Sequence, residues 1–303
     1  MTITTVALIG AGNMGSRMAR CIKRAGFDLI VCDQDLTVLE AFKKDGVSVT
    51  QQPRDCALAD AIIVLVANDE QIVSVTCGPA GFIGAIPSEH QPLVCIMSTT
   101  LPSTLQQVAA GLKNTRAHLI DAPVSGGLVK AEQGTLTIMM SGDDQDLNRA
   151  EPLMRSMGTE IFRCGALGSA EVIKVINNML GIANIYLAAE AFELAAKHGV
   201  NIEQIAPILE VSSGRNFMSL DSAMTQQHYQ AWARSKEAFF SLANIVSKDL
   251  HLAKNLAQGA QLDLPLLNEL SRHVDATDET VFTRWQFVTQ KDRKSTRLNS
   301  SHT

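Results

Sequence analysis

A lysine and two asparagines stand in an otherwise apolar stretch of the second half of the chain. Lys174 and Asn178 are four residues apart, with Asn177 beside them, in a proline-free run from Gly168 to Gly199. If this run is one helix, Lys174 and Asn178 face the same side. A lysine there either extends its ammonium to solvent or is kept in the protein for a catalytic role, because burying an unpaired ammonium costs on the order of several kcal/mol. The pattern alone favours the first interpretation.

A glycine-rich turn earlier in the chain indicates a dinucleotide-binding unit and reverses that preference. A buried strand is predicted over Thr5–Ile9, and it leads directly into Gly10-Ala-Gly12-Asn-Met-Gly15 and a helical pattern. Gly10 allows the tight turn, Gly12 lets a pyrophosphate approach the backbone, and Gly15 lets the helix lie close to the strand. The turn therefore predicts a phosphate site built from Gly10, Gly12, Asn13, Met14 and Gly15.

Asp33 ends the second predicted strand, Leu29–Cys32, at the distance from the glycines where such units carry an acidic residue. A carboxylate at this position accepts hydrogen bonds from the ribose 2′-OH of NAD and repels the 2′-phosphate of NADP. We therefore expect NAD as the cofactor, with NADP disfavoured. The alternative is an ordinary turn with a solvent-facing aspartate.

Strand and helix patterns alternate through the rest of the first half, which is typical of a doubly wound parallel sheet. Val66 and Ala67 lie at the end of one buried strand and Thr99 follows another, so we expect all three at the carboxyl edge of the sheet, where such folds bind their ligand. Thr99 and its neighbours serve equally well as a helix cap. The predicted helices are 36–44, 53–59, 102–111 and 144–156, and the further predicted strands are 47–49, 61–66, 92–97, 118–121, 135–140 and 160–164.

Ser125, Gly126 and Gly127 follow the predicted strand His118–Asp121. Two glycines after a serine leave backbone N–H groups uncovered by side chains, which makes a suitable nest for a carboxylate. A plain turn is the alternative.

Every segment beyond residue 165 is helical in pattern. Asn201 is predicted to cap a helix that reaches Leu209, a longer helix covers Phe239–Gln258, and one last helix covers Leu264–Gln290. We therefore predict an N-terminal Rossmann-type domain over residues 1–165 and an all-α substrate and oligomerisation domain over 166–291, joined by a long interdomain helix. Residues 292–303 lack apolar periodicity and resemble a translated sequencing adapter, so we exclude them from the fold as non-native.

The composition favours an intracellular enzyme. Of the 303 residues 46% are hydrophobic and 19% charged, and the net charge of −5 argues against nucleic acid or an anionic membrane as the main partner. We expect no apolar run long enough to span a bilayer, and hence a cytoplasmic location. The six cysteines and seven histidines show no metal-ligand spacing, so neither a metal nor a disulfide framework is expected. The helix predicted over Gly168–Gly199 is apolar on more faces than one domain covers, which predicts a homodimer or homotetramer.

Four motifs resemble, in order, those of the β-hydroxyacid dehydrogenase family, whose members include 3-hydroxyisobutyrate dehydrogenase-like enzymes. The resemblance covers nearly the whole chain up to residue 291. The cofactor signature is Gly10–Gly15 with Met18 and Ala19, and the substrate-binding signature is Asp121–Gly127. The catalytic segment is Gly165–Gly168 with Lys174, Asn177 and Asn178, and the last motif is Lys248–Leu250. Asn-Asn in place of His-Asn after the lysine argues against 6-phosphogluconate dehydrogenase.

The resemblance implies a role for each of these residues. Lys174 would be the catalytic acid/base and Asn178 would hold the substrate beside it. Substrate contacts are implied for Ser125, Gly126, Gly127, Asn177 and Lys248, and cofactor contacts for Thr99 and Lys248. The chemistry agrees, because reducing a carbonyl by hydride transfer builds negative charge on its oxygen, which an ammonium both stabilises and protonates.

The implied function is NAD-dependent interconversion of a small 3-hydroxy acid and its semialdehyde or oxo acid. One alternative is an NADPH-preferring semialdehyde reductase of the same family, which Asp33 disfavours. Another is a catalytically silent cofactor-binding module that acts as a scaffold or sensor. Retention of Lys174, Asn178 and Lys248 speaks against it.

Overall fold

The computed structural model describes residues 2–219 and 221–288. The chain divides into two compact units, Met1–Val175 and Ile176–Thr303. The adapter-like segment 292–303 lies outside the described residues.

The first unit is built on a six-stranded parallel sheet. The central strands are short aliphatic runs whose residues are almost all buried on both faces, which is the pattern that parallel strands covered by helices require. In the sheet their order is β3 (Ser48–Thr50), β2 (Asp28–Cys32), β1 (Thr5–Ile9), β4 (Ala61–Val64), β5 (Leu93–Ile96) and β6 (His118–Asp121). The order reverses between β1 and β4, so the predicted Rossmann-type sheet is confirmed.

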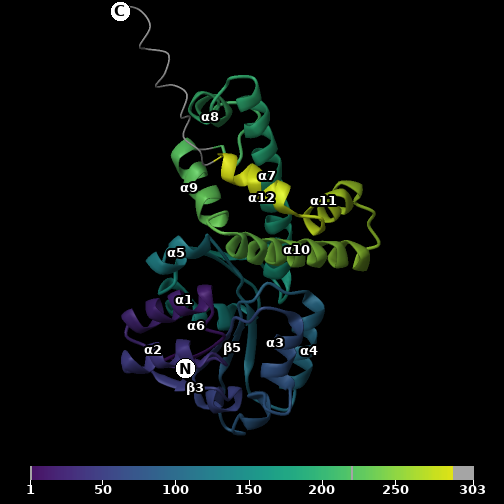
Figure 1. Cartoon of the computed structure of the whole chain (residues 1–303). Coiled ribbons are helices and arrows are strands. Elements are labelled where there is room, and N and C mark those ends of the chain that lie inside the picture. Colours follow the sequence, from purple (N-terminus) through teal and green to yellow (C-terminus); the bar gives the residue numbers. More distant parts are fainter. Residues whose placement is uncertain (1, 220, 289–303) are drawn as a thin grey trace, which may run out of the picture. The chain divides into compact units, whose positions relative to one another are not determined.

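Helices cover both faces of this sheet, and alternate residues of each strand feed two separate cores. On β1, Val6 and Leu8 belong to one core, whereas Ala7 and Ile9 belong to the other. The first core packs under α1 (Asn13–Arg24), α2 (Leu36–Lys44) and α6 (Asp144–Arg155), and the second under α3 (Asp69–Cys77) and α4 (Pro102–Leu112). Figure 1 shows the two groups of helices on opposite sides of β5.

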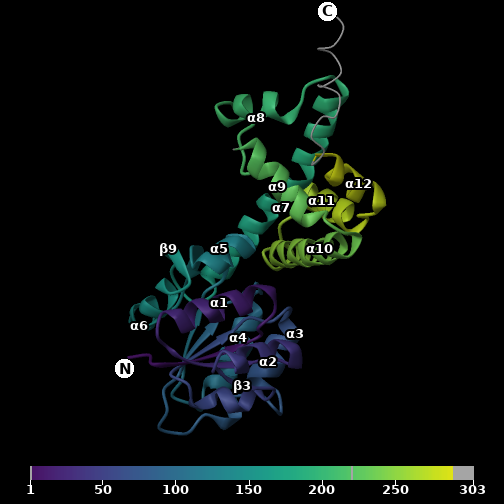
Figure 2. The same ribbon diagram turned by 60° about the vertical axis from the view of Figure 1, so that its left-hand side comes forward.

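A three-stranded sheet completes the unit. It contains β7 (Val124–Ser125), β8 (Leu136–Met140) and β9 (Gly158–Arg163), with β7 antiparallel and β9 parallel to β8. The short helix α5 (Gly127–Gln133) lies beside α1 (Figure 2). The sequence did not predict α3, nor did it predict β7, which has two residues, or α5, which has seven residues between Gly126 and Gly134. Two 3₁₀ helices occur at Pro53–Leu58, where the sequence predicted a short α-helix, and at Ile83–Ala85.

The predicted long helix is confirmed as α7, which runs without a break over Ser169–Lys197. Among the described residues, it is the one helix long and apolar enough to cross a membrane, judged by length and composition only. The expectation that no apolar run reaches that length is therefore wrong. The five charged residues of α7 lie toward its two ends, so the stretch from Val175 to Ala189 between them is mostly apolar. A buried core helix meets the same criterion.

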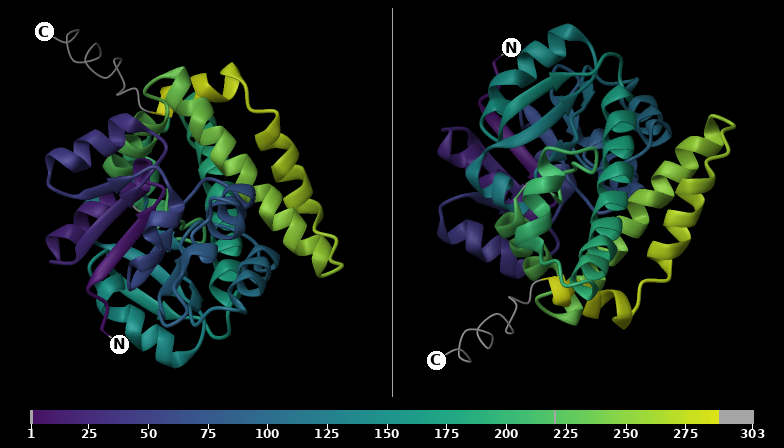
Figure 3. Two further views of the ribbon diagram at one scale, coloured as in Figure 1. Left: turned by 90° about the horizontal axis from the view of Figure 1, so that it is seen from below. Right: turned by 90° about the horizontal axis from the view of Figure 1, so that it is seen from above.

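The second unit continues from α7 as a set of helices. They are α8 (Ile202–Glu210), α9 (Ser222–Trp232), α10 (Lys236–Gly259), α11 (Pro265–Asp275) and α12 (Glu279–Val288). Asn201 caps α8 as predicted, since its side chain accepts from the Gln204 amide while the Gln204 side chain accepts from the Asn201 amide. Trp285 of α12 makes edge contacts with Tyr229 of α9 and with Phe239 of α10. Figure 3 shows α10 and α11, in green and yellow-green, running side by side.

The prediction of a single last helix over Leu264–Gln290 is wrong, because α11 and α12 are separate. The Asp278 carboxylate accepts hydrogen bonds from the amides of Thr280 at 2.8 Å and Val281 at 3.3 Å. These bonds satisfy the first amides of a new helix, so the chain ends one helix and starts another.

Candidate functional site

The predicted cofactor residues follow four neighbouring strands of the first unit. Gly10–Gly15 follow β1, Asp33 follows β2, Val66 and Ala67 follow β4, and Thr99 follows β5. Because these strands are parallel, the segments that follow them gather at one edge of the sheet. The structure therefore brings these residues to a common edge.

The glycine turn is held by close backbone packing at two of its three glycines. Gly10 has a φ of +97°, and a Cβ added there would lie 2.2 Å from the carbonyl oxygen of Leu65. A Cβ on Gly15 would lie 2.0 Å from the carbonyl oxygen of Gly10. The protein's own backbone therefore leaves no room for a side chain at either position.

Gly12 differs, because a Cβ added there would have no other atom within 4 Å. It caps α1 with a φ of −64°, which any residue adopts, so the fold itself does not require glycine there. No side chain caps the helix, and its first turn carries no acidic residue. Open space in front of a 12-residue helix N-terminus fits the pyrophosphate of a dinucleotide.

The Asp33 carboxylate is fixed from both sides. Its Oδ2 accepts from the Ala11 amide at 2.6 Å, and its Oδ1 accepts from the Asp35 amide at 2.9 Å. The side chain is half-buried. A carboxylate has about four acceptor positions, so lone pairs remain for a ribose hydroxyl.

The segments after β4 and β5 are joined to each other. The Ser98 hydroxyl accepts from the Val66 amide at 2.7 Å, and the Gln71 side chain accepts from the Ala67 amide at 2.9 Å. Thr99 is half-buried, whereas the next residue, Thr100, is fully buried.

Ser125, Gly126 and Gly127 lie between β7 and α5. Ser125 pairs with Thr137 across the small sheet, and the two glycines have φ values of +136° and +69°. No side chain caps α5 at Gly126. The glycine turn itself is therefore present in the first unit, with the Lys130 side chain close to Gly126.

Lys174 lies on α7 in the first unit, and only 8% of it is exposed. A lysine that extended its ammonium freely into solvent would be far more exposed, so the solvent-directed interpretation is not supported. Glu171, one turn earlier on α7, is fully buried, and its Oε2 accepts from the Thr100 amide at 3.0 Å. The Thr100 hydroxyl in turn donates to Asp69 at 2.5 Å.

The remaining predicted residues belong to the second unit. Asn178 donates from Nδ2 to Asp249 Oδ2 at 2.7 Å, and Lys248 Nζ lies 2.9 Å from Asp249 Oδ1. Asp249 thus brings Asn178 and Lys248 together, although sequence reasoning gave it no role. Asn177 is exposed, and its side chain donates to that of Asn178 at 3.2 Å.

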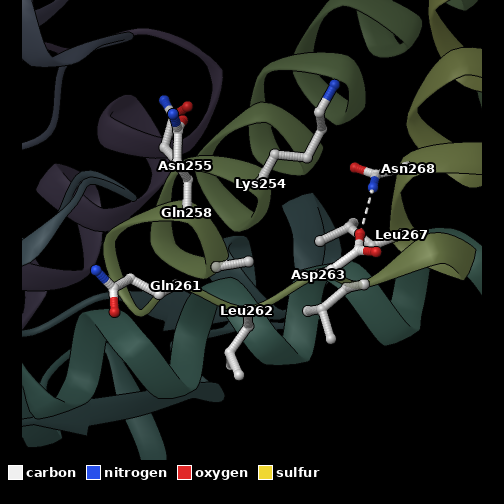
Figure 4. A pocket seen from close by; sticks show the side chains of 10 residues that line it. Lys254, Asn255, Gln258, Gln261, Leu262, Asp263, Leu267 and Asn268 are labelled. Carbon is white, nitrogen blue, oxygen red and sulfur yellow. Dashed lines mark hydrogen bonds between the residues drawn. The ribbon is translucent and has the colours of Figure 1, made fainter.

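A separate cavity of about 450 Å³ lies in the second unit at the end of α10 and the start of α11 (Figure 4). Its wall includes Lys254, Gln261 and Asp263, and Asn268 donates to Asp263 at 3.4 Å. None of the predicted site residues lines it. Within residues 2–219 and 221–288, no group of three or more His, Cys, Asp or Glu side chains is arranged to hold a metal.

Comparison with known proteins assigns a family to both units. The family model for the NAD-binding domain of 6-phosphogluconate dehydrogenase matches residues 5–165, and the model for the NAD-binding region of NADP-dependent 3-hydroxyisobutyrate dehydrogenase matches residues 168–289. Mitochondrial 3-hydroxyisobutyrate dehydrogenase of Rattus norvegicus is 32% identical over 273 residues, which cover 87% of this chain and 78% of the relative. NAD-dependent L-serine dehydrogenase of Pseudomonas aeruginosa is 31% identical over 271 residues, which cover 86% of this chain and 88% of the relative.

A solved structure agrees. The 3-hydroxyisobutyrate dehydrogenase of Salmonella typhimurium superposes with a TM-score of 0.76 at 25% identity, covering 93% of this chain and 99% of that one. Fold and glycine turn together define an NAD(P)-binding oxidoreductase. Within that class, the chain belongs to the 3-hydroxyisobutyrate dehydrogenase-like family of β-hydroxyacid dehydrogenases, and it is an NAD(P)-dependent 3-hydroxyacid dehydrogenase family enzyme.

The different surroundings of Gly12 and Gly15 predict different effects of the same substitution. Gly12→Ala should leave the melting temperature unchanged but weaken NAD binding at least about 10-fold, because its methyl group enters the space of the pyrophosphate. Gly15→Ala should destabilise the fold by about 1–3 kcal/mol, because its methyl group meets a backbone carbonyl. Thermal melting and a cofactor titration on both variants separate the two effects. Equal destabilisation by the two variants would contradict the assignment of Gly12.

Proposed function

We propose that the chain catalyses NAD-dependent oxidation of a small 3-hydroxy acid, or the reverse reduction, with Lys174 as the proton-exchanging group. The observation that carries the proposal is the burial of Lys174 in a unit that also presents the glycine turn and Asp33. A bound nicotinamide supplies or accepts the hydride. In reduction, the Lys174 ammonium faces the developing oxyanion and gives it a proton, and in oxidation the neutral amine takes the hydroxyl proton.

Substrate recognition is proposed to begin at Ser125, Gly126 and Gly127. The backbone amides of a glycine turn and the serine hydroxyl are suited to a carboxylate. Asn178, one helical turn beyond Lys174, is proposed to orient the substrate hydroxyl, and Asn177 and Lys248 are proposed as further contacts. The hydrogen bond from Asn178 to Asp249 supports a fixed orientation of the Asn178 amide.

The named substrates of the relatives support a substrate class. L-Serine and 3-hydroxyisobutyrate share a 3-hydroxypropanoate skeleton with a primary hydroxyl at C3, and they differ at C2 in carrying an amino or a methyl group. The shared chemistry is a hydroxymethyl group one carbon away from a carboxylate. We propose that this chain acts on an acid of that class.

NAD is proposed as the preferred cofactor. The family descriptions name both NAD and NADP, so the preference must come from the chain itself. The hydrogen bonds that fix Asp33 support NAD, because a held carboxylate cannot swing away from a 2′-phosphate. An NADPH-preferring reductase remains the second candidate within the family.

A second copy of this chain is the proposed partner of α7. Ile176, Leu180, Leu187 and Leu194 are 45–68% exposed, and their spacing of four and seven residues aligns them in one narrow stripe. Apolar side chains at this spacing are typical of helices that pack against another helix. The stripe supports a homodimer or homotetramer.

Lys174 variants test the catalytic role. Lys174→Ala should lower kcat by about 10²- to 10⁴-fold and leave NAD affinity nearly unchanged, because the phosphate and ribose contacts remain. Lys174→Arg should rescue little, because guanidinium keeps its charge but does not release its proton at neutral pH. Lys197→Ala, which removes an exposed lysine from the same helix, is the matched control and should behave as wild type. Full activity of the Arg variant, or of the Ala variant, would rule out the acid/base role. NAD binding without turnover in the unaltered protein would instead favour the silent-module alternative.

Asp33 variants test cofactor choice. Asp33→Arg should shift the ratio of kcat/KM values towards NADP, because it removes an interaction worth about 1–3 kcal/mol and adds a phosphate partner. Asp35→Asn, a change at the neighbouring carboxylate that caps α2, should not shift the ratio. Equal use of NADPH and NADH by the unaltered protein would contradict the assignment.

A charge in the leucine stripe tests oligomerisation. Leu187→Glu should dissociate the oligomer, because it buries a carboxylate in an apolar contact. Leu58→Glu, at an equally exposed leucine of the first unit, should not. Light scattering at micromolar concentration measures both, and a monomeric unaltered protein would refute the proposal.

A further inference from the structure

Asp121 is a buried carboxylate that the proposed reaction does not use. It is the last residue of β6 and is completely inaccessible to solvent. Its Oδ1 accepts from the Ser141 hydroxyl at 2.5 Å and from the Gly168 amide at 2.8 Å, and its Oδ2 accepts from the Glu171 amide at 3.1 Å. A carboxylate is buried at such a position only when donors compensate for its lost hydration.

Ser141 completes the arrangement. It follows β8, is completely buried, and exchanges two backbone hydrogen bonds with Asp121, at 3.2 and 2.9 Å. Its hydroxyl oxygen also accepts from the Ala170 amide at 3.0 Å. The side chains of Asp121 and Ser141 therefore accept hydrogen bonds from three backbone amides at the start of α7.

These amides are the ones that a helix cannot satisfy internally. The first four N–H groups of an α-helix have no partner within it, and a residue at the helix start usually caps them. In α7 the partners are instead Asp121 and Ser141, which precede Gly168 by 47 and 27 residues in the sequence. The cap thus fixes the first turn of α7 to the sheet, within one unit.

Both chain segments that leave this cap lead to proposed site residues. Forward from Asp121, the chain reaches Ser125 and the glycine turn four residues later. Along α7, Lys174 lies three residues beyond Glu171, about one turn, on the same rigid helix. A shift or rotation of the first turn would therefore move Lys174 relative to Ser125.

We propose that Asp121, assisted by Ser141, is a positioning residue that sets the place of Lys174 relative to the carboxylate-binding turn. It does not touch substrate or cofactor, and it acts by holding the amides of Gly168 and Glu171. An asparagine cannot replace it, because the amide NH₂ would face one of the donors. This inference rests on the proposed role of Lys174.

Asp60 offers a matched control. Its carboxylate also accepts two amides and one hydroxyl, those of Thr4 and Thr5 at 2.9 Å and the Thr4 hydroxyl at 2.7 Å. It lies beside the start of β1, at the opposite edge of the sheet from the glycine turn. Asp60→Asn therefore perturbs a similar three-donor site far from the proposed chemistry.

The experiment compares Asp121→Asn, Ser141→Ala and Asp60→Asn by steady-state kinetics well below the melting temperature of each variant. Asp121→Asn should lower kcat by on the order of 10- to 100-fold, with the substrate KM and the NAD affinity nearly unchanged, because misplacement of a reacting group costs turnover. Ser141→Ala should also lower kcat, but by a smaller factor. The double variant should lose less kcat than the two single losses multiplied together, because both residues act through the same cap. Asp60→Asn should lower the melting temperature without lowering kcat.

Four results would overturn the inference. They are an equal loss of kcat in Asp121→Asn and Asp60→Asn, no loss in Asp121→Asn, a loss that appears in NAD affinity, or additive effects of the two cap variants. If Asp121→Asn does not fold, a wild-type kcat in Ser141→Ala would also overturn the inference. Loss of turnover in Lys174→Ala with wild-type turnover in Asp121→Asn would reject the positioning role alone, whereas full activity of Lys174→Ala would reject the proposed function.

Discussion

The N-terminal amides of α7 must be satisfied inside the protein, and the carboxylate of Asp121 and the hydroxyl of Ser141 do so. A buried carboxylate and three buried N–H groups are each costly alone, and their mutual hydrogen bonds remove both costs. Burial raises the pKa of Asp121, while the hydrogen bonds from Ser141, Gly168 and Glu171 oppose that rise. The start of α7 is thereby tied to the end of β6.

The same edge of the sheet gathers the other elements of the site. Each parallel strand that ends there contributes a loop, and those loops carry the glycine turn, Asp33 and Thr99. Glu171 extends the link, since its side chain holds the Thr100 amide while its own amide is held by Asp121. One short stretch of α7 therefore connects the segment after β5, the end of β6 and Lys174.

Much of this fold could be predicted from the sequence because its signals are local. Buried strands such as Thr5–Ile9, the helix Leu36–Lys44 and the Asn201 cap follow from patterns within a few residues. The break at Asp278 was missed, because an aspartate that starts a helix looks like a polar residue within one. The cap by Asp121 could not be predicted, since its partners lie 47 and 50 residues away. A glutamate in the first turn of an apolar helix, Glu171, was the visible signal that polar partners lie nearby.

The central claim, that this family member oxidises a 3-hydroxy acid held by its carboxylate, is tested most directly by matched substrate pairs. Initial rates of NADH formation would be measured with 3-hydroxyisobutyrate against isobutanol and with L-serine against alaninol, which each lack only the carboxylate oxygens. Glycerate and threonate extend the set of acids. We predict that at least one acid is oxidised, and that kcat/KM for its carboxylate-free partner is lower by at least about 10²-fold, because the nest amides are then left unpaired. Comparable oxidation of acid and alcohol, or tight NAD binding without oxidation of any acid, would contradict the account.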